Sequence, residues 1–268
     1  MFDHARTAGR TNLACRAATE FRTISCNTWS VHGTEAEYSA IVLGATGNVG
    51  GRIVQLLIQS SRCKKVVVVT RRKTNAFPDA KVSEVVVNMD RLEEEVTPHA
   101  QGIDVALAAF GVGKGTAQMP DEEVRKIEIA YPLAFCRAAR AGGVRVAGVM
   151  TAVDADSTSR LKYVKIMGEK EKAVESVPFD FLGIYRPATI FGNSNTPGIL
   201  ESLMPLVHWA VPAKYHSIHK NDLARAMVAQ SEQAFLEIAQ GTAPARPKVK
   251  ILEYGEMRPF FVKGDSGK

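Results

Sequence analysis

The amino-acid sequence predicts an α/β fold in which helices cover both faces of a doubly wound parallel sheet. From Tyr38 onward, short runs rich in β-branched residues alternate with longer segments of helical character. The runs are almost continuously apolar, which is typical of strands that are buried on both faces of a parallel sheet. No internal repeat, low-complexity linker or break in composition divides this part of the chain. We therefore expect residues 37–268 to form a single domain of doubly wound topology.

The apolar runs predict six strands, in the order 40–47, 65–70, 84–88, 104–110, 144–152 and 179–187. Helices are expected in the connections between them, at residues 52–60, 121–141 and 161–173. A later helix is expected to start at, or be capped by, Asp222, with Ala224, Met227 and Val228 on its buried side. The tail, residues 243–250 and 261–268, is rich in Pro, Gly and Lys, and we expect its end to lack regular structure.

The composition argues against several classes of protein. The 268 residues are 46% hydrophobic and 23% charged, as in an ordinary soluble globular domain. No apolar run approaches the roughly 20 residues of a membrane-spanning helix. The net charge of +6 comes from basic residues that are interleaved with acidic ones, so it indicates a solvated surface rather than a nucleic-acid-binding face. The four cysteines form no CxxC pair, which argues against a zinc site or a disulfide framework and for a reducing compartment.

The first 36 residues differ from the rest of the chain. They contain four arginines, no lysine and several Ser and Thr residues, a composition similar to that of a mitochondrial transit peptide. Asp3 and Glu20 depart from that pattern because transit peptides contain few acidic residues. We expect mitochondrial import. The alternative is a plain N-terminal extension on a cytoplasmic protein.

A glycine triplet follows the first expected strand. In IVLGATGNVGGRIV, Gly44, Gly47 and Gly50 have the spacing GxxGxxG at the point where the strand must become a helix. Glycine at these positions permits the tight turn, the approach of backbone to a pyrophosphate, and close helix–sheet packing. The start of the helix adds unpaired N–H groups and a dipole that favours an anion. The triplet therefore predicts a dinucleotide-binding site rather than an ordinary turn.

The end of the second expected strand indicates which dinucleotide is bound. A site that prefers NAD(H) has an acidic residue there to hold the 2′-hydroxyl of the ribose. This chain instead has Thr70, Arg71, Arg72 and Lys73, and no acid before Asp79. A guanidinium is planar, permanently charged and able to bind a phosphate through two hydrogen bonds. We therefore predict NADP(H), the alternative being a solvated basic strand end.

These motifs together resemble the atypical and extended short-chain dehydrogenases, in particular the branch that contains the HIV Tat-interactive oxidoreductase. The likeness covers about residues 38–229. It rests on LGATGNVG, the strand end TRRK, Tyr163, the following Gly168-Glu169 and the segment RPATIFG at residues 186–192. The resemblance implies a Rossmann sheet with a small C-terminal substrate-side lobe, formed by about residues 193–215 and the tail. The NADPH-holding accessory subunit of respiratory complex I is similar by the same motifs, though more distantly.

The resemblance also implies a set of cofactor-binding residues. Those around the pyrophosphate would be Gly44, Thr46, Gly47, Asn48, Val49 and Gly50. Arg71 and Arg72 would bind the 2′-phosphate, and Asn88 would lie near the adenine. The end of the fourth strand, Ala109, Phe110 and Gly111, would pass the ribose, and Pro187, Ala188 and Thr189 would line the nicotinamide.

The catalytic residues of the family are only partly present. In the family, a Ser after the fifth strand orients the carbonyl, a Tyr donates the proton, and a Lys four residues later binds ribose hydroxyls and lowers the pKa of the Tyr. Tyr163 is present here and Thr151 offers a hydroxyl near the Ser position, but Met167 occupies the Lys position. Lys165 faces away from Tyr163, and Lys170 lies two turns beyond it, about 10 Å along the helix axis.

Two functions are compatible with this pattern. The first is an NADP(H)-binding protein with a degraded catalytic site, serving as a structural or assembly subunit of a multi-subunit mitochondrial complex. The second is an active NADPH-dependent reductase, working free or as a homodimer, that uses Tyr163 on a carbonyl or quinone substrate, with a water or Lys170 in the proton relay. We expect no nucleic-acid partner and no transmembrane segment in either case.

Overall fold

The computed structural model describes residues 36–113, 118–192, 211–242 and 248–261. The chain divides into the units Met1–Thr34 and Glu35–Lys268, and every described residue belongs to the second. The expected N-terminal extension, apart from its last residue, lies outside the described residues. So does most of the segment expected to form the C-terminal lobe, residues 193–210.

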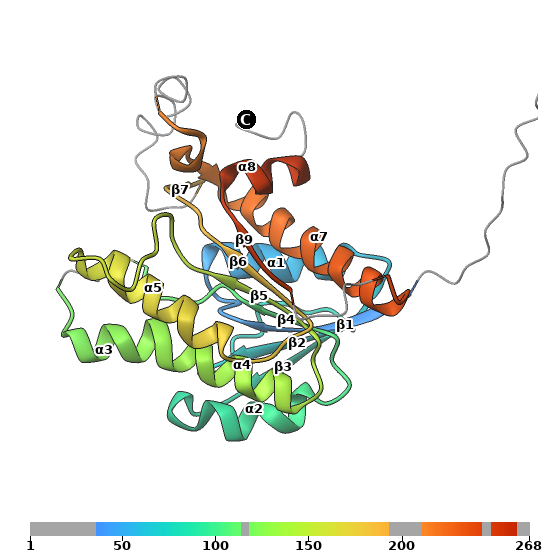
Figure 1. Ribbon diagram of the computed structural model, residues 1–268. Helices are drawn as coiled ribbons and strands as arrows, with labels where there is room; N and C mark the ends of the chain where they lie inside the picture. The colour runs from blue at the N-terminus through green and yellow to red at the C-terminus, as the bar shows by residue number, and fades with distance from the viewer. Residues whose placement is uncertain (1–35, 114–117, 193–210, 243–247, 262–268) are drawn as a thin grey trace, which may run out of the picture. The chain divides into compact units, whose positions relative to one another are not determined.

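In the described part of the chain, seven strands form the central sheet, in the order β3-β2-β1-β4-β5-β6-β9 (Figure 1). Their bounds are β1 Tyr38–Leu43, β2 Cys63–Thr70, β3 Val82–Val86, β4 Val105–Ala108, β5 Val146–Met150, β6 Phe181–Tyr185 and β9 Lys248–Leu252. Every neighbouring pair is parallel. The chain runs from β1 outward to β3 and then returns to β4, so the strand order reverses between β1 and β4. The doubly wound parallel Rossmann fold predicted from the sequence is confirmed.

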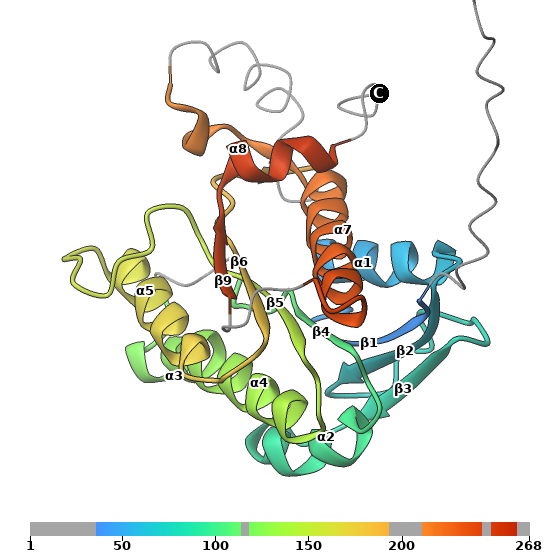
Figure 2. The same cartoon turned by 45° about the vertical axis from the view of Figure 1, so that its right-hand side comes forward.

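Helices cover both faces of this sheet (Figure 2). The helices α1 Asn48–Gln59 and α7 Lys220–Ala239 cover one face, and α2 Leu92–Ala100, α4 Tyr131–Ala141 and α5 Lys162–Glu175 cover the other. Successive residues of each strand point to opposite layers. In β1, Ala40 and Val42 join the core beside α1 and α7, whereas Ile41 and Leu43 join the core beside α2 and α4. Burial on both faces explains the continuous apolar runs of the sequence.

The helix expected at residues 121–141 is present, but a π-helical turn interrupts it. Helix α3 Asp121–Arg125 continues into the π-helical η2 Lys126–Ala130 and then into α4. A π turn is rare and frequently occurs at functional sites. Here it carries Glu128, a carboxylate that is only 4% exposed.

Short elements complete the described chain. They are η1 Met89–Arg91, β7 Ile190–Phe191, η4 Ala213–Tyr215, β8 Ile218–His219, α8 Tyr254–Met257 and η5 Arg258–Phe260. Strands β7 and β8 pair in parallel as a separate small sheet. Within the described ranges, no helix combines the length and the apolar character needed to cross a bilayer.

Strand β9 is absent from the six strands that the sequence predicts. It begins inside the Pro- and Lys-rich segment 243–250 and pairs with β6 at the edge of the sheet. Val249 and Ile251 are substantially exposed, and the Lys250 ammonium donates a hydrogen bond to Gln230 at 2.7 Å. An edge strand tolerates exposed and charged side chains, which removes the apolar signal that marks the inner strands.

Two helix starts differ from the prediction. Helix α1 begins at Asn48, four residues earlier than expected, so residues 48–51 belong to its first turn. Helix α7 begins at Lys220, and its N-cap is His219, whose Nδ1 accepts a hydrogen bond from the Asn221 N–H at 3.2 Å. The prediction that Asp222 starts or caps this helix is therefore wrong, since Asp222 lies inside the first turn.

Candidate functional site

A cavity of about 800 Å³ opens at the carboxyl ends of the central strands. Its walls are residues 47–49 after β1, 109–113 after β4, 150–154 after β5, and parts of 187–190 after β6, together with side chains of α5 and η2. Doubly wound sheets bind ligands at this edge, where the strand order reverses. The volume falls within the range of roughly 300–1,000 Å³ that is usual for small-molecule and cofactor sites.

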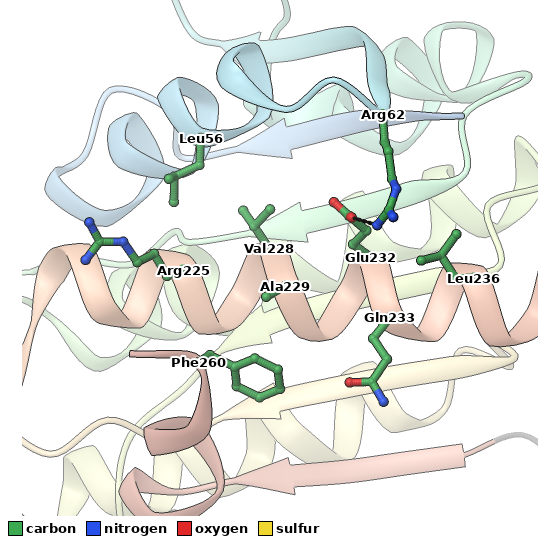
Figure 3. Close-up of a pocket in the computed structure, with 9 residues that line it drawn as sticks. All are labelled: Leu56, Arg62, Arg225, Val228, Ala229, Glu232, Gln233, Leu236 and Phe260. Carbon is green, nitrogen blue, oxygen red and sulfur yellow. Dashed lines mark hydrogen bonds and ion pairs between the residues drawn. The ribbon is translucent and has the colours of Figure 1, made fainter. Parts of the chain in front are cut away.

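A second hollow, of about 420 Å³, lies on the face of the sheet that α1 and α7 cover, between α1, α7 and η5 (Figure 3). Its lining includes the apolar side chains of Leu56, Val228 and Phe260, and an ion pair joins Arg62 to Glu232 at 2.7 Å. The residues that line it include none of the predicted site residues. The cavity at the carboxyl edge is therefore the candidate site.

The glycine loop after β1 has the close packing that its sequence predicts. Gly44 has φ +88°, and a Cβ atom there would lie 2.4 Å from the carbonyl oxygen of Ala109. A Cβ atom on Gly50 would lie 2.1 Å from the carbonyl oxygen of Gly44. Both positions therefore require glycine for the turn and for the contact between helix and strand.

The start of α1 suits an anion. Gly47 is its N-cap, with no capping side chain, and the first turn contains no acidic residue. The first N–H groups of a helix have no partner within it, and the helix dipole adds partial positive charge at that end. With Gly47, Asn48 and Val49 on the cavity wall, this helix end fits the pyrophosphate of a dinucleotide.

The cavity brings together many, but not all, of the predicted site residues. Those on its wall are Gly47, Asn48, Val49, Ala109, Phe110, Gly111, Thr151, Tyr163, Pro187 and Ala188. Those outside its lining are Gly44, Thr46, Gly50, Arg71, Arg72, Asn88 and Thr189. Gly44 and Gly50 pack against backbone atoms beneath the loop. Arg71 and Arg72 are exposed directly after β2, the neighbour of β1.

Asn88 and Thr189 already have structural hydrogen bonds. Asn88 is the N-cap of η1, and its side-chain oxygen accepts a bond from the Asp90 N–H at 3.0 Å. The carbonyl oxygen of Thr189 accepts a bond from the Ile218 N–H at 2.9 Å, beside the small sheet of β7 and β8. Contact of either residue with a cofactor remains a prediction.

The phenol of Tyr163 lies on the cavity wall in an environment that disfavours ionisation. Desolvation and the negative charge of the Glu128 carboxylate raise the pKa of Tyr163 to about 12. Met167, one helical turn later, also lines the cavity and is 1% exposed. A thioether supplies neither a positive charge nor a hydrogen-bond donor. The phenol is therefore in its neutral form at neutral pH, and Met167 does not lower its pKa.

The hydroxyl of Thr151 is engaged in a buried network. It donates a hydrogen bond to the Glu171 carboxylate at 2.7 Å. The same carboxylate accepts two hydrogen bonds from the Arg186 guanidinium, one of them from Nε at 2.8 Å. This network ties α5 to the ends of β5 and β6. Because a hydroxyl has a single proton, Thr151 in this arrangement cannot also donate to a substrate carbonyl.

A buried ion pair on the cavity wall joins Lys170 to Glu128, a pairing that the sequence does not predict. Lys170 of α5 lies 3.2 Å from Glu128 of η2, and their side chains are only 2% and 5% exposed. The Lys170 ammonium also donates to the carbonyl oxygen of Phe110 at 3.1 Å, and Glu128 accepts a bond from the Val112 N–H at 2.7 Å. The pair is thus anchored to the loop after β4. The sequence signal for it is a charged residue on the apolar stripe of each helix, at Glu128 and at Lys170.

The arrangement can hold a dinucleotide along the carboxyl edge of the sheet. The glycine loop and the start of α1 fit its phosphates, the apolar walls fit its rings, and the polar side chains of the wall fit its sugar hydroxyls. Among the described residues, no cluster of His, Cys, Asp and Glu has the make-up of a metal site. Hydride chemistry would come from a nicotinamide cofactor, and the protein would provide its binding and orientation.

Comparison with known proteins supports NAD(P)H binding by this chain. A family model described as NAD(P)H-binding matches residues 44–234. The chain is 30% identical over 154 residues to Protein HTATIP2 of Rattus norvegicus, a match that covers 57% of this chain and 62% of the length of the rat protein. It is 27% identical over 230 residues to Protein fmp52, mitochondrial, of Aspergillus niger, which covers 83% of this chain and 97% of that protein.

Solved structures share the fold at low sequence identity. MoeE5 in complex with UDP-glucose and NAD superposes with a TM-score of 0.58 and 15% identity, over 82% of this chain and 79% of that chain. Pen from Bacillus thuringiensis superposes with a TM-score of 0.60 and 12% identity, over the same fractions of the two chains. The resemblance inferred from the motifs is confirmed, and the chain belongs to the NAD(P)H-binding family of Rossmann-fold proteins.

Proposed function

We propose that this protein binds NADP(H) in the cavity at the carboxyl edge and retains it without steady turnover, as a nucleotide-holding structural or assembly subunit of a larger mitochondrial complex. The observation that carries this proposal is the environment of Tyr163, whose pKa is raised to about 12 by partial desolvation and by the Glu128 carboxylate, although 45% of the residue is exposed. The lysine that would lower this pKa in the family is replaced by the buried Met167. We infer that a cavity able to hold the cofactor adjoins a proton donor that is not activated.

The mitochondrial part of the proposal has two supports. The first 36 residues contain four arginines and no lysine, as in a transit peptide. Relatives in Candida albicans and Aspergillus niger carry the word mitochondrial in their names. The role in a larger complex is inferred from the contrast between a cavity that fits a cofactor and a proton donor that lacks its activating lysine.

The first test is NADPH binding and turnover by the purified full-length protein. We expect NADPH to bind, detected by its fluorescence, and its absorbance to remain constant when aldehydes, ketones and quinones are offered. Steady oxidation at the rate of an ordinary reductase, on the order of 1–10³ s⁻¹, would contradict the proposal. Loss of that oxidation in Tyr163→Phe would then establish the alternative, an active carbonyl or quinone reductase.

The native size of the protein in a gentle mitochondrial extract tests the assembly role separately. Co-migration with a much larger complex is the expected result. Migration as a free monomer or dimer would refute the subunit role and leave the cofactor site unaffected. One structural feature favours the reductase alternative, because Lys170 places an ammonium group on the wall of the same cavity.

Preference for NADP(H) predicts a selective effect of the two arginines after β2. Arg71→Ala and Arg72→Ala are each expected to weaken NADPH binding by roughly 10- to 100-fold and to leave NADH binding nearly unchanged, because a guanidinium bonds the 2′-phosphate that only NADPH carries. Fluorescence titration of both nucleotides measures the effect. The matched control is Lys64→Ala, an exposed cation at the opposite end of β2. Equal weakening of both nucleotides would indicate a general structural effect and would refute the assignment.

A further inference from the structure

The buried pair of Lys170 and Glu128 is unusual because it lies on the wall of a ligand cavity. Burying two charges has a large desolvation cost, which their attraction offsets only when the geometry is good. A polar pair inside an apolar helix contact is therefore weak evidence for stability and invites a functional explanation. Glu128 also lies on a π-helical turn, which is a second, independent feature that is frequent at functional sites.

The hydrogen bonds of Lys170 leave it able to bind a ligand. An ammonium has three N–H donors. Within the described structure, two of them are directed to the Phe110 carbonyl oxygen at 3.1 Å and to Glu128 at 3.2 Å. The side chain lines the cavity, so the third donor can serve a group inside it.

The charge of the pair indicates which kind of ligand group would accept the third hydrogen bond of Lys170. Lys170 and Glu128 together carry no net charge, and a carboxylate so close to the cavity disfavours a phosphate. A sugar hydroxyl, in contrast, both donates and accepts hydrogen bonds. Two adjacent hydroxyls could accept from the Lys170 ammonium and donate to the Glu128 carboxylate or to the Phe110 carbonyl. The chemistry of the pair therefore fits a vicinal diol.

The sheet order indicates which diol of a dinucleotide would reach it. The pyrophosphate site lies after β1, and Arg71 and Arg72 follow β2, on one side of β1. Lys170 contacts the end of β4, on the other side of β1. A dinucleotide that extends from β2 across β1 places its second ribose, the one attached to nicotinamide, on the Lys170 side.

We propose that Lys170, held by Glu128 and the Phe110 carbonyl, is the residue that binds and positions the nicotinamide ribose diol in this chain. This inference rests on the proposed cofactor site. It implies that two roles combined in one lysine elsewhere in the family are separated here. Lys170 retains the binding of the ribose, while its charge is neutralised by Glu128, so that the phenol of Tyr163 remains unactivated.

The variants must remove the cation without leaving a buried charge alone. In the double variant Glu128→Gln/Lys170→Met both charges disappear, and the amide oxygen of Gln can still accept the Val112 N–H bond. The wild-type protein, in which the two charges also sum to zero, serves as the comparison. Thermal unfolding of both proteins verifies that they are folded before any binding is measured.

Three ligands distinguish a ribose contact from a general effect. 2′-Phospho-ADP carries the adenosine half and both phosphates of the pyrophosphate, 2′-phospho-ADP-ribose adds the second ribose, and NADPH adds the nicotinamide. We expect the double variant to bind NADPH and 2′-phospho-ADP-ribose roughly 10- to 100-fold more weakly than the wild-type protein does, and to bind 2′-phospho-ADP equally well.

Each other outcome has a definite meaning. Equal weakening of all three ligands, or of none, would refute the role of Lys170 and leave the proposed cofactor site standing. Weakening of NADPH alone would also refute it, because the contact would then be to the nicotinamide ring. Failure of the wild-type protein to bind NADPH at all would refute the proposed function itself.

Discussion

Replacing Met167 by lysine is expected to lower the pKa of Tyr163 from its present value of about 12 and to raise NADPH-dependent carbonyl reduction by roughly 10²-fold or more. Residue 167 lies one helical turn after Tyr163 on the same face of α5 and lines the same cavity. A cation within about 4–6 Å favours the ionised phenol and lowers its pKa by roughly 1–3 units.

Two readouts separate the change in acidity from the change in rate. The ultraviolet absorbance of tyrosinate should appear at a lower pH in Met167→Lys than in the wild-type protein, and this difference should vanish when Tyr163→Phe is added. The initial rate of NADPH loss with a panel of aldehydes, ketones and quinones measures the gain in activity.

Met167→Leu is the matched control, because it keeps an apolar side chain of similar volume at a residue that is 1% exposed. If Met167→Lys is folded and binds NADPH but reduces nothing faster than Met167→Leu does, the missing lysine is not what limits the chemistry. The remaining explanation would lie at Thr151, whose hydroxyl proton is given to Glu171 rather than to the cavity.

The sequence predicts the features of the fold that depend on local chemistry. The inner strands are buried on both faces, so their apolar runs stand out, and Gly44 and Gly50 are required by contacts that a Cβ atom would prevent. Strand β9 is not recognised in the sequence because it lies at an edge of the sheet. Its backbone pairs with β6 while most of its side chains, including that of Lys248, remain exposed, so the strand has no apolar run.

The candidate site is predicted less completely, because its key contacts join distant segments. Glu128 and Lys170 each interrupt an apolar helical stripe, which is visible in the sequence, but their pairing across 42 positions is not. The π-helical turn that carries Glu128 has no evident sequence marker. The same limit applies to Thr151, which the sequence offers as a hydroxyl for the substrate and the structure turns toward Glu171.

Replacing Glu128 by alanine is expected to lower the free energy of unfolding by about 3–5 kcal/mol, because it leaves the buried Lys170 without its counter-charge and the Val112 N–H without its acceptor. The midpoint of urea unfolding, measured without added nucleotide, gives the change. Glu94→Ala is the matched control, since Glu94 forms an ion pair with Arg91 at 2.7 Å but is 68% exposed. That variant should unfold close to the wild-type midpoint. A loss in Glu128→Ala no larger than in Glu94→Ala would show that the pair is not buried in solution.

The double variant Glu128→Gln/Lys170→Met separates stability from ligand binding. Replacing a buried ion pair by uncharged groups of similar volume is often neutral or stabilising. We therefore expect its unfolding midpoint to be at or above that of the wild-type protein in the absence of nucleotide. A ligand that binds only the native state adds stability according to its affinity, so NADPH should stabilise the wild-type protein more than the double variant. That combination would mean that the ion pair serves the bound dinucleotide, since the fold alone would be equally stable without it.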